Sequence, residues 1–179
     1  SGLISDSKRV MQLQSPYFLQ MLDSVYDGQS FYTIHEAPDS CRSLTHFFED
    51  KKTIQLNTLW TIGTQVMEAL MELETKKLSY GSLNCSNIYW TDKGTVKLAK
   101  VYLPIRLYQV HMTDFNVIED CIFYAPEYLQ RQDHTIVSDI YSFGVLLYIF
   151  FSRQWPYPYT NRVHDLKKSL VHSPKLFTP

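Results

Sequence analysis

The chain has 179 residues, a formal net charge of −1 and a sequence pI near 6.6, and its length allows one domain with a hydrophobic core. Hydrophobic residues make up 45% and charged residues 20%, which is typical of a globular protein, and no basic run indicates a nucleic-acid partner. Cys41, Cys85 and Cys121 are widely spaced without a C-x-x-C pair, which favours free thiols in a reducing compartment, expected to be the cytoplasm.

The N-terminal part is predicted to form one helix and one hairpin. Apolar residues near one helical face predict a helix over 5–14, and Pro16 follows it because proline disfavours helical geometry at the residue before it. Two strands are predicted over 18–26 and 29–36. Asp27-Gly28 between them is typical of a two-residue hairpin turn.

The middle of the chain is predicted to hold a connector over 38–43, a short helix over 44–49 and a long helix. Asn57 is the expected N-cap of the long helix, which runs to about Lys76. One face of this helix recurs at helical spacing and is expected to point into the core. Its residues are Leu59, Ile62, Val66, Leu70 and Leu73.

The C-terminal part begins with predicted short strands over 87–91 and 96–99, followed by an irregular segment over 101–124. The apolar stretch over 136–151 is too short and too interrupted to span a membrane, so a buried helix over 136–152 and no direct membrane insertion are expected. An amphipathic helix is predicted over 161–171. Strands that precede most of the helices predict an α+β fold.

Short motifs in a fixed order carry a resemblance to a known family. They are Y-G-S-L-N-C-S-N at 80–87, K-L-A-K-V-Y at 97–102, A-P-E at 125–127 and S-D-I-Y-S-F-G at 138–144. Together they resemble the signature of eukaryotic protein kinases, in a form similar to tyrosine kinases. The resemblance implies a truncated N-lobe of two strands plus a helix at 1–37. It further implies a hinge at 38–43 and a partial, mainly helical C-lobe at 44–179, all in one partial domain.

The resemblance also assigns positions in the catalytic machinery, where phosphoryl transfer requires carboxylates beside the acceptor hydroxyl and the metal. Ser82 stands where the family has the catalytic aspartate, and Lys100 stands where it has the metal-binding aspartate. Lysine cannot ligate Mg²⁺ and would repel it. Asn87 matches the second metal ligand, but a hydrogen bond that holds the loop is the favoured interpretation. No metal, no cofactor and no enzymatic activity are therefore expected.

The adenine pocket is expected to be degenerate. Pro38 aligns with the hinge residue that donates an N–H to adenine, and proline has no N–H. His35 takes the gatekeeper position, or else caps a strand end. Tyr89 stands where an aliphatic residue lies under adenine, and its ring would fill the pocket or point into the core. An alternative keeps a ligand, with Lys100 holding phosphate in place of a metal.

Two acidic residues are expected to be structural. The resemblance implies that Glu127 pairs with an arginine late in the large lobe, in a region expected beyond Pro179, and that Asp139 is buried and accepts N–H bonds near Tyr80-Gly81. The predicted function is that of a pseudokinase, acting as a protein-interaction scaffold or allosteric regulator in signalling. Its partners would be proteins, among them another domain covering the missing N-lobe strands. The alternatives are a nucleotide-sensing module without catalysis and a divergent active kinase.

Overall fold

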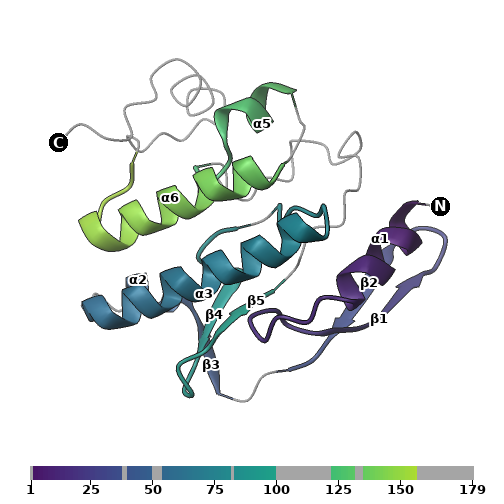
Figure 1. Cartoon of the computed structure of the whole chain (residues 1–179), viewed down its shortest axis with the longest axis horizontal. Coiled ribbons are helices and arrows are strands. Elements are labelled where there is room, and N and C mark those ends of the chain that lie inside the picture. Colours follow the sequence, from purple (N-terminus) through teal and green to yellow (C-terminus); the bar gives the residue numbers. More distant parts are fainter. Residues whose placement is uncertain are drawn as a thin grey trace.

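The computed structural model has the predicted α+β arrangement, with helices layered over short strands (Figure 1). The predicted helix over 161–171 and most of the irregular segment over 101–124 lie outside the residues that the structure describes. The described residues are 2–37, 40–49, 54–81, 83–99, 122–131 and 135–156.

The N-terminal unit is a helix packed on a two-stranded antiparallel hairpin. It consists of α1 (Gly2–Met11), β1 (Met21–Tyr26) and β2 (Phe31–His35). The hairpin turn lies one residue later than predicted. Asp27 Oδ1 accepts hydrogen bonds from the N–H groups of Gln29 and Ser30 at 2.8 and 2.7 Å, so Asp27 precedes the turn and caps it.

A three-stranded antiparallel sheet follows, in the order β3 (Cys41–Ser43), β4 (Ile88–Thr91) and β5 (Val96–Leu98). β3 corrects the prediction of a connector, because its three residues pair with β4 although they are too few to show a period of two. The predicted short helix follows at once as α2 (Leu44–Glu49), with the expected bounds.

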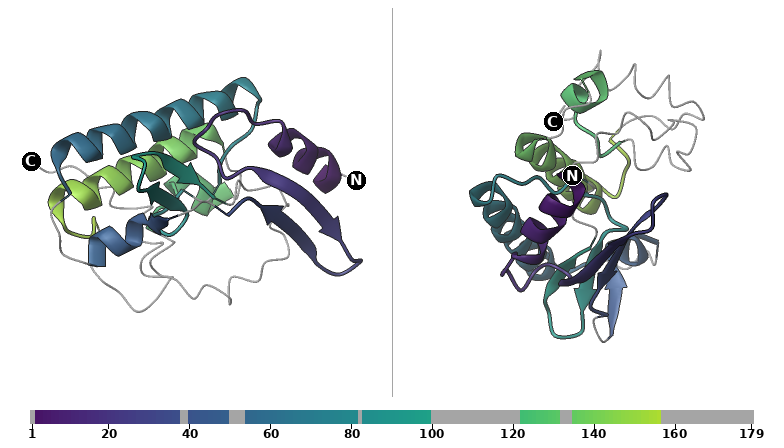
Figure 2. Two further views of the ribbon diagram at one scale, coloured as in Figure 1. Left: turned by 90° about the horizontal axis from the view of Figure 1, so that it is seen from below. Right: turned by 90° about the vertical axis from the view of Figure 1, so that its right-hand side faces the viewer.

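Two long helices stack over this sheet, α3 (Leu56–Thr75) and α6 (Ile136–Ser152) (Figure 2). The five α3 residues predicted to face inward are all buried, and α6 has the predicted bounds. The short helix α5 (Pro126–Arg131) was not predicted. The N-cap of α3 is Gln55 rather than Asn57, because the first intrahelical bond runs from Leu59 N–H to Gln55 O at 3.0 Å.

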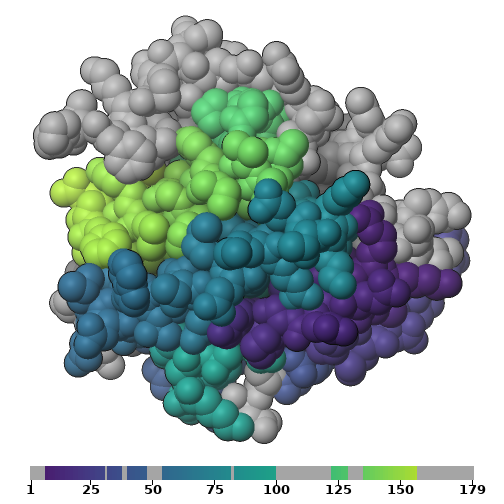
Figure 3. Space-filling model, in the orientation of Figure 1, coloured from purple at the N-terminus to yellow at the C-terminus, as the bar shows by residue number. Residues whose placement is uncertain are grey.

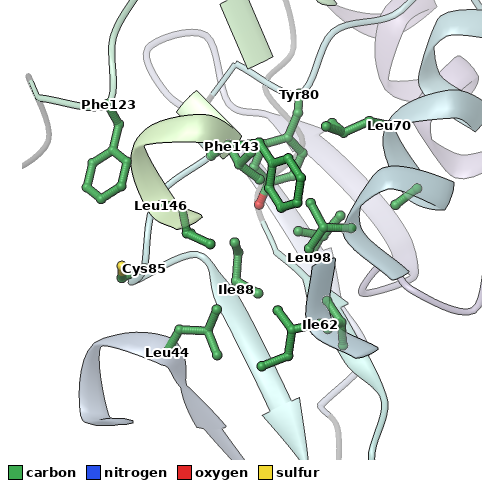
Figure 4. Packing of buried hydrophobic residues seen from close by; sticks show 14 of the residues in the cluster. Leu44, Ile62, Leu70, Tyr80, Cys85, Ile88, Leu98, Phe123, Phe143 and Leu146 are labelled. Atoms are coloured by element: carbon green, nitrogen blue, oxygen red, sulfur yellow. The ribbon is translucent and has the colours of Figure 1, made fainter. Parts of the chain in front are cut away.

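The core lies where α2, α3, β4, β5 and α6 meet. Leu44, Ile62, Ile88 and Leu146 point toward one another from four of these elements (Figure 4). The ring of Tyr80 is fully buried in the same cluster. No helix in the described ranges is long and apolar enough to cross a lipid bilayer.

The C-terminus of α3 ends in a Schellman motif. The N–H of Leu78 bonds to Leu73 O at 2.9 Å, and the N–H of Lys77 bonds to Glu74 O at 2.9 Å. Lys77 has φ of 53°, in the left-handed region that costs a residue with a Cβ about 1–2 kcal/mol. Glycine is the usual residue at this position.

Substitution Lys77→Gly should therefore stabilise the protein by about 0.5–1 kcal/mol, since relief of the left-handed strain outweighs the added freedom of the unfolded chain. Lys76→Gly is the matched control, because Lys76 has a φ of −86° and should lose stability on the same change. Urea unfolding of the two variants measures the difference. A loss of stability in both would show that Lys77 carries no strain.

Candidate functional site

The candidate site is built around the loop between α3 and β4, which is fixed by a buried carboxyl group. Asp139 lies in the first turn of α6 with none of its surface exposed. Its Oδ2 accepts the N–H of Tyr80 at 2.6 Å, and its Oδ1 accepts the N–H of Gly81 at 2.9 Å. These are the contacts that the family resemblance implied. Gly81 has a φ of 81°, which places the loop backbone where only glycine is free of strain.

Burial raises the pKa of Asp139 to about 7, because the charged form loses the solvation of water. The backbone N–H groups of Gly81 and Tyr80 act in the opposite direction and lower it. Burial is the larger effect. The folded protein therefore holds a proton on this carboxyl over a pH range in which the unfolded chain has released it.

The side chain of Tyr80 continues the network from the loop to the sheet. Its hydroxyl donates to the carbonyl oxygen of Ala99 and also lies 3.2 Å from that of Asn87. The N–H of Ala99 bonds to Asn87 O at 2.9 Å, which closes the contact between the start of β4 and the end of β5. Figure 4 shows the Tyr80 ring inside the core beside Phe143 and Leu98.

The loop is turned by a residue that the sequence analysis did not single out. Asn84 Oδ1 accepts hydrogen bonds from the N–H groups of Ser86 and Asn87 at 2.9 and 3.0 Å, which forms an Asx turn. Asparagine is common in such turns, so Asn84 itself was the available sequence signal. Asn87 is buried with 7% exposure. The residues expected to decide the catalytic chemistry, Ser82 and Lys100, lie outside the described part of the chain.

The described residues do not form a metal site: among them no group of three or more His, Cys, Asp or Glu side chains could hold an ion. Asn87 contributes one amide, whereas Mg²⁺ is usually held by carboxylates and substrate phosphates. By itself Asn87 is a poor site for Mg²⁺, and Lys100, at the other metal-ligand position of the family, lies outside the described residues.

Two of the three residues expected to line the adenine pocket lie in described strands, His35 in β2 and Tyr89 in β4. His35 Nδ1 lies 3.3 Å from Leu19 O. Because a carbonyl oxygen can only accept, Nδ1 is the donor, and this bond joins the end of β2 to Leu19. Tyr89 is half-buried in β4 and is not part of the buried core. Pro38 lies outside the described residues.

An ion pair beside this region links the two sheets. Lys97 Nζ on β5 lies 3.1 Å from Glu36 Oε1, and it also donates to Phe18 O at 3.4 Å. The N–H of Gln20 lies 3.2 Å from the same Glu36 oxygen, and this N–H, together with Lys97, lowers the pKa of Glu36. No local sequence pattern indicates this pair, because its members are 61 residues apart in the chain.

Glu127 in α5 has a partner on α6 in the described part of the chain. The hydroxyl of Ser138 donates to Glu127 Oε1 at 3.3 Å, and Ser138 is fully buried. This contact ties α5 to the first turn of α6, one residue before Asp139.

A cavity of about 400 Å³ opens between α3 and α6, away from the loop. Its walls are apolar, and several of these side chains are largely exposed, including Trp60 at 74%. Figure 3 shows the two helices side by side on this face. The residues that shape it are Leu56, Trp60, Met67 and Met71 from α3, and Leu147 and Phe151 from α6.

Comparison with known proteins identifies the family. A family model described as protein tyrosine and serine/threonine kinase matches residues 1–179. The chain belongs to this family. This kinase-family chain is 30% identical to human protein-tyrosine kinase 6 over 161 residues, which is 87% of the chain and 35% of that protein. It is 24% identical to the serine/threonine-protein kinase TIO of Arabidopsis thaliana over 163 residues, which is 91% of the chain and 12% of that protein.

A third relative is tyrosine protein-kinase src-1 of Caenorhabditis elegans, 25% identical over 164 residues, which cover 88% of the chain and 31% of that protein. The chain thus spans about a third or less of the length of these relatives. The relatives are named as protein kinases, and this corrects the prediction that the chain is not an enzyme. That prediction rested on Ser82 and Lys100, and no geometry of the described residues bears on either side chain.

Substitution Asp139→Asn should destabilise the fold, because the amide has one acceptor oxygen for two N–H donors. The difference should depend on pH. Between about pH 4 and pH 7 the unfolded state releases the proton that the folded state keeps. The contribution of Asp139 to the free energy of unfolding therefore falls with rising pH, by at most about 1.4 kcal/mol per pH unit. The asparagine variant lacks this slope. Denaturant unfolding at several pH values measures it, and parallel profiles would contradict the raised pKa.

Substitution Tyr80→Phe should cost about 1–3 kcal/mol, because it leaves the buried carbonyl of Ala99 without its hydroxyl donor. Tyr89→Phe is the control, since Tyr89 loses the same hydroxyl from a half-buried position. Chemical unfolding of both variants compares the two losses. Equal effects would show that the Tyr80 hydroxyl does not stabilise the loop.

Proposed function

We propose that this kinase-family chain acts through binding to other proteins, as a scaffold or allosteric regulator in cytoplasmic signalling. The observation that carries the proposal is the network from Asp139 through Tyr80 to Ala99, which maintains the large-lobe framework. In the sequence, Ser82 and Lys100 stand where the family signature has two aspartates. A maintained framework is what a binding function requires of the fold.

The surface of the chain supports a protein partner. Trp60 and Phe151 line the cavity between α3 and α6 and are 74% and 61% exposed. Exposed apolar surface of this kind marks protein contacts. In this proposal residues 1–37 are the N-lobe remnant, 38–43 the hinge and 44–179 the C-lobe, and a further domain covers the exposed face of the β1–β2 hairpin.

Phosphoryl transfer to proteins is the second candidate, and the names of the relatives favour it. Because the chain covers at most 35% of the length of these three relatives, the activity of a whole protein comes to it only as a proposal. The sequence retains Asn87 of the family's metal ligands. Transfer would then proceed without the carboxylates at positions 82 and 100.

A thermal-shift titration with ATP, in Mg²⁺ and in chelator, separates the candidates, with incorporation of labelled phosphate into protein measured alongside. If protein binding is the main function, the melting temperature should move little in either condition. A ligand at 100 times its dissociation constant stabilises by about 2.7 kcal/mol, which is readily seen. A shift that requires Mg²⁺, with label incorporated, would favour transfer and overturn the proposal.

A shift in chelator alone would favour nucleotide sensing, with Lys100 in place of a metal. Lys100→Ala should abolish such a shift.

The double variant Ser82→Asp, Lys100→Asp supplies both carboxylates and serves as the matched comparison for the Mg²⁺ condition. Its Mg²⁺-dependent shift should be larger than that of the wild type. If the wild type and the double variant respond equally, the residues at 82 and 100 do not decide the function.

A further inference from the structure

Two charged side chains join the N-terminal unit to α3, and the proposed function uses neither. Arg9 projects from the last turn of α1, and Glu72 lies in the last turn of α3. Each contacts backbone atoms at the end of the other helix. α1 and the C-terminal half of α3 lie next to each other in Figures 1 and 3.

Arg9 binds the carbonyl end of α3. Its guanidinium nitrogen donates to Lys76 O at 2.5 Å and to Lys77 O at 3.1 Å. The carbonyl groups at a helix C-terminus lack intrahelical donors and carry the negative end of the helix dipole, so a cation is favoured there. The left-handed conformation of Lys77 belongs to the turn that presents these oxygens.

Glu72 binds the chain that leaves α1. Its Oε1 accepts the N–H of Gln14 at 2.7 Å, and its Oε2 accepts the N–H of Ser15 at 2.7 Å. Both carboxylate oxygens are therefore engaged by consecutive backbone donors. Hydrogen bonds to an ionised acceptor are shorter and stronger than neutral ones.

A second attachment lies close by and differs in kind. Phe18 forms a parallel bridge with Leu98 of β5. Around it the N–H of Leu19 bonds to Leu98 O at 2.9 Å, and the N–H of Leu98 bonds to Tyr17 O at 2.6 Å. Together with the neighbouring Lys97–Glu36 ion pair, this backbone attachment fixes one region of the N-terminal unit on β5. It leaves the direction of α1 to be set by contacts further along the helix, among them the buried side chain of Val10.

We propose that Arg9 and Glu72 form a reciprocal lock that fixes α1 against the end of α3. With the lock closed, the N-terminal unit of residues 2–37 is held in one orientation about the attachment at Leu98. With it open, the unit turns about that point while α3 and α6 remain packed. The lock is thus a conformational device that couples the hairpin to the helical layer.

Hydrogen exchange measured by mass spectrometry on the whole chain tests the lock. Arg9→Met and Glu72→Gln remove one charge each; the first keeps an unbranched stem and the second keeps the shape of the side chain. In both variants, amides within residues 2–37 should exchange about tenfold faster, while the protection of α3 and α6 stays unchanged. Lys8→Met and Glu74→Gln are the matched controls, since they make the same charge changes at exposed neighbouring positions, and they should leave exchange unaltered.

The double variant distinguishes one lock from two separate caps. If Arg9 and Glu72 close a single device, the double variant should exchange no faster than the faster single variant. Additive effects would overturn the proposal, as would unchanged exchange in residues 2–37 or a uniform rise that includes α3 and α6. Arg9→Lys keeps the charge without the forked donor, so its increase in exchange should be smaller than that of Arg9→Met. If Glu72→Gln does not fold, these two Arg9 variants still test the lock.

Discussion

The carboxyl group of Asp139 links the helical layer to the loop that carries the family's signature residues. It lies fully buried at the start of α6 and accepts the N–H groups of Tyr80 and Gly81. From there the hydroxyl of Tyr80 reaches Ala99, at the end of β5. A buried carboxyl is costly unless its oxygens have donors, and the loop backbone is costly to bury unless its N–H groups have acceptors. The carboxyl oxygens and the two N–H groups therefore satisfy each other's hydrogen bonds in the interior.

This network ends, in the sequence, directly before the two unusual residues of the chain. Gly81 precedes Ser82 in the sequence and Ala99 precedes Lys100, and the network holds both Gly81 and Ala99. The N-terminal unit joins the same strand through Leu98. Loop, helical layer and N-terminal unit thus meet at β5. Contacts of Asp139, Tyr80 and Leu98 thus hold the parts of the family fold together.

The sequence predicted those parts of the fold that a strong period specifies. The bounds of α2 and α6 and the buried face of α3 follow from helical spacing of apolar residues. β3 was missed because three residues carry no period, and its pairing with β4 is decided by the tertiary fold. The bonds of Arg9, Glu72 and the Lys97–Glu36 pair join distant segments, which no local pattern indicates. The absence of activity was inferred from two side chains, and the kinase relatives corrected it.

The most direct test of this account is a pH titration of the backbone amide resonances of Tyr80 and Gly81 by nuclear magnetic resonance. If the Asp139 carboxyl bonds to both groups and burial raises its pKa, both amide protons should shift together with a midpoint near pH 7. Asp139→Asn should abolish the transition. A midpoint near pH 4, or no titration of these two amides in the wild type, would contradict the central role of this buried carboxyl.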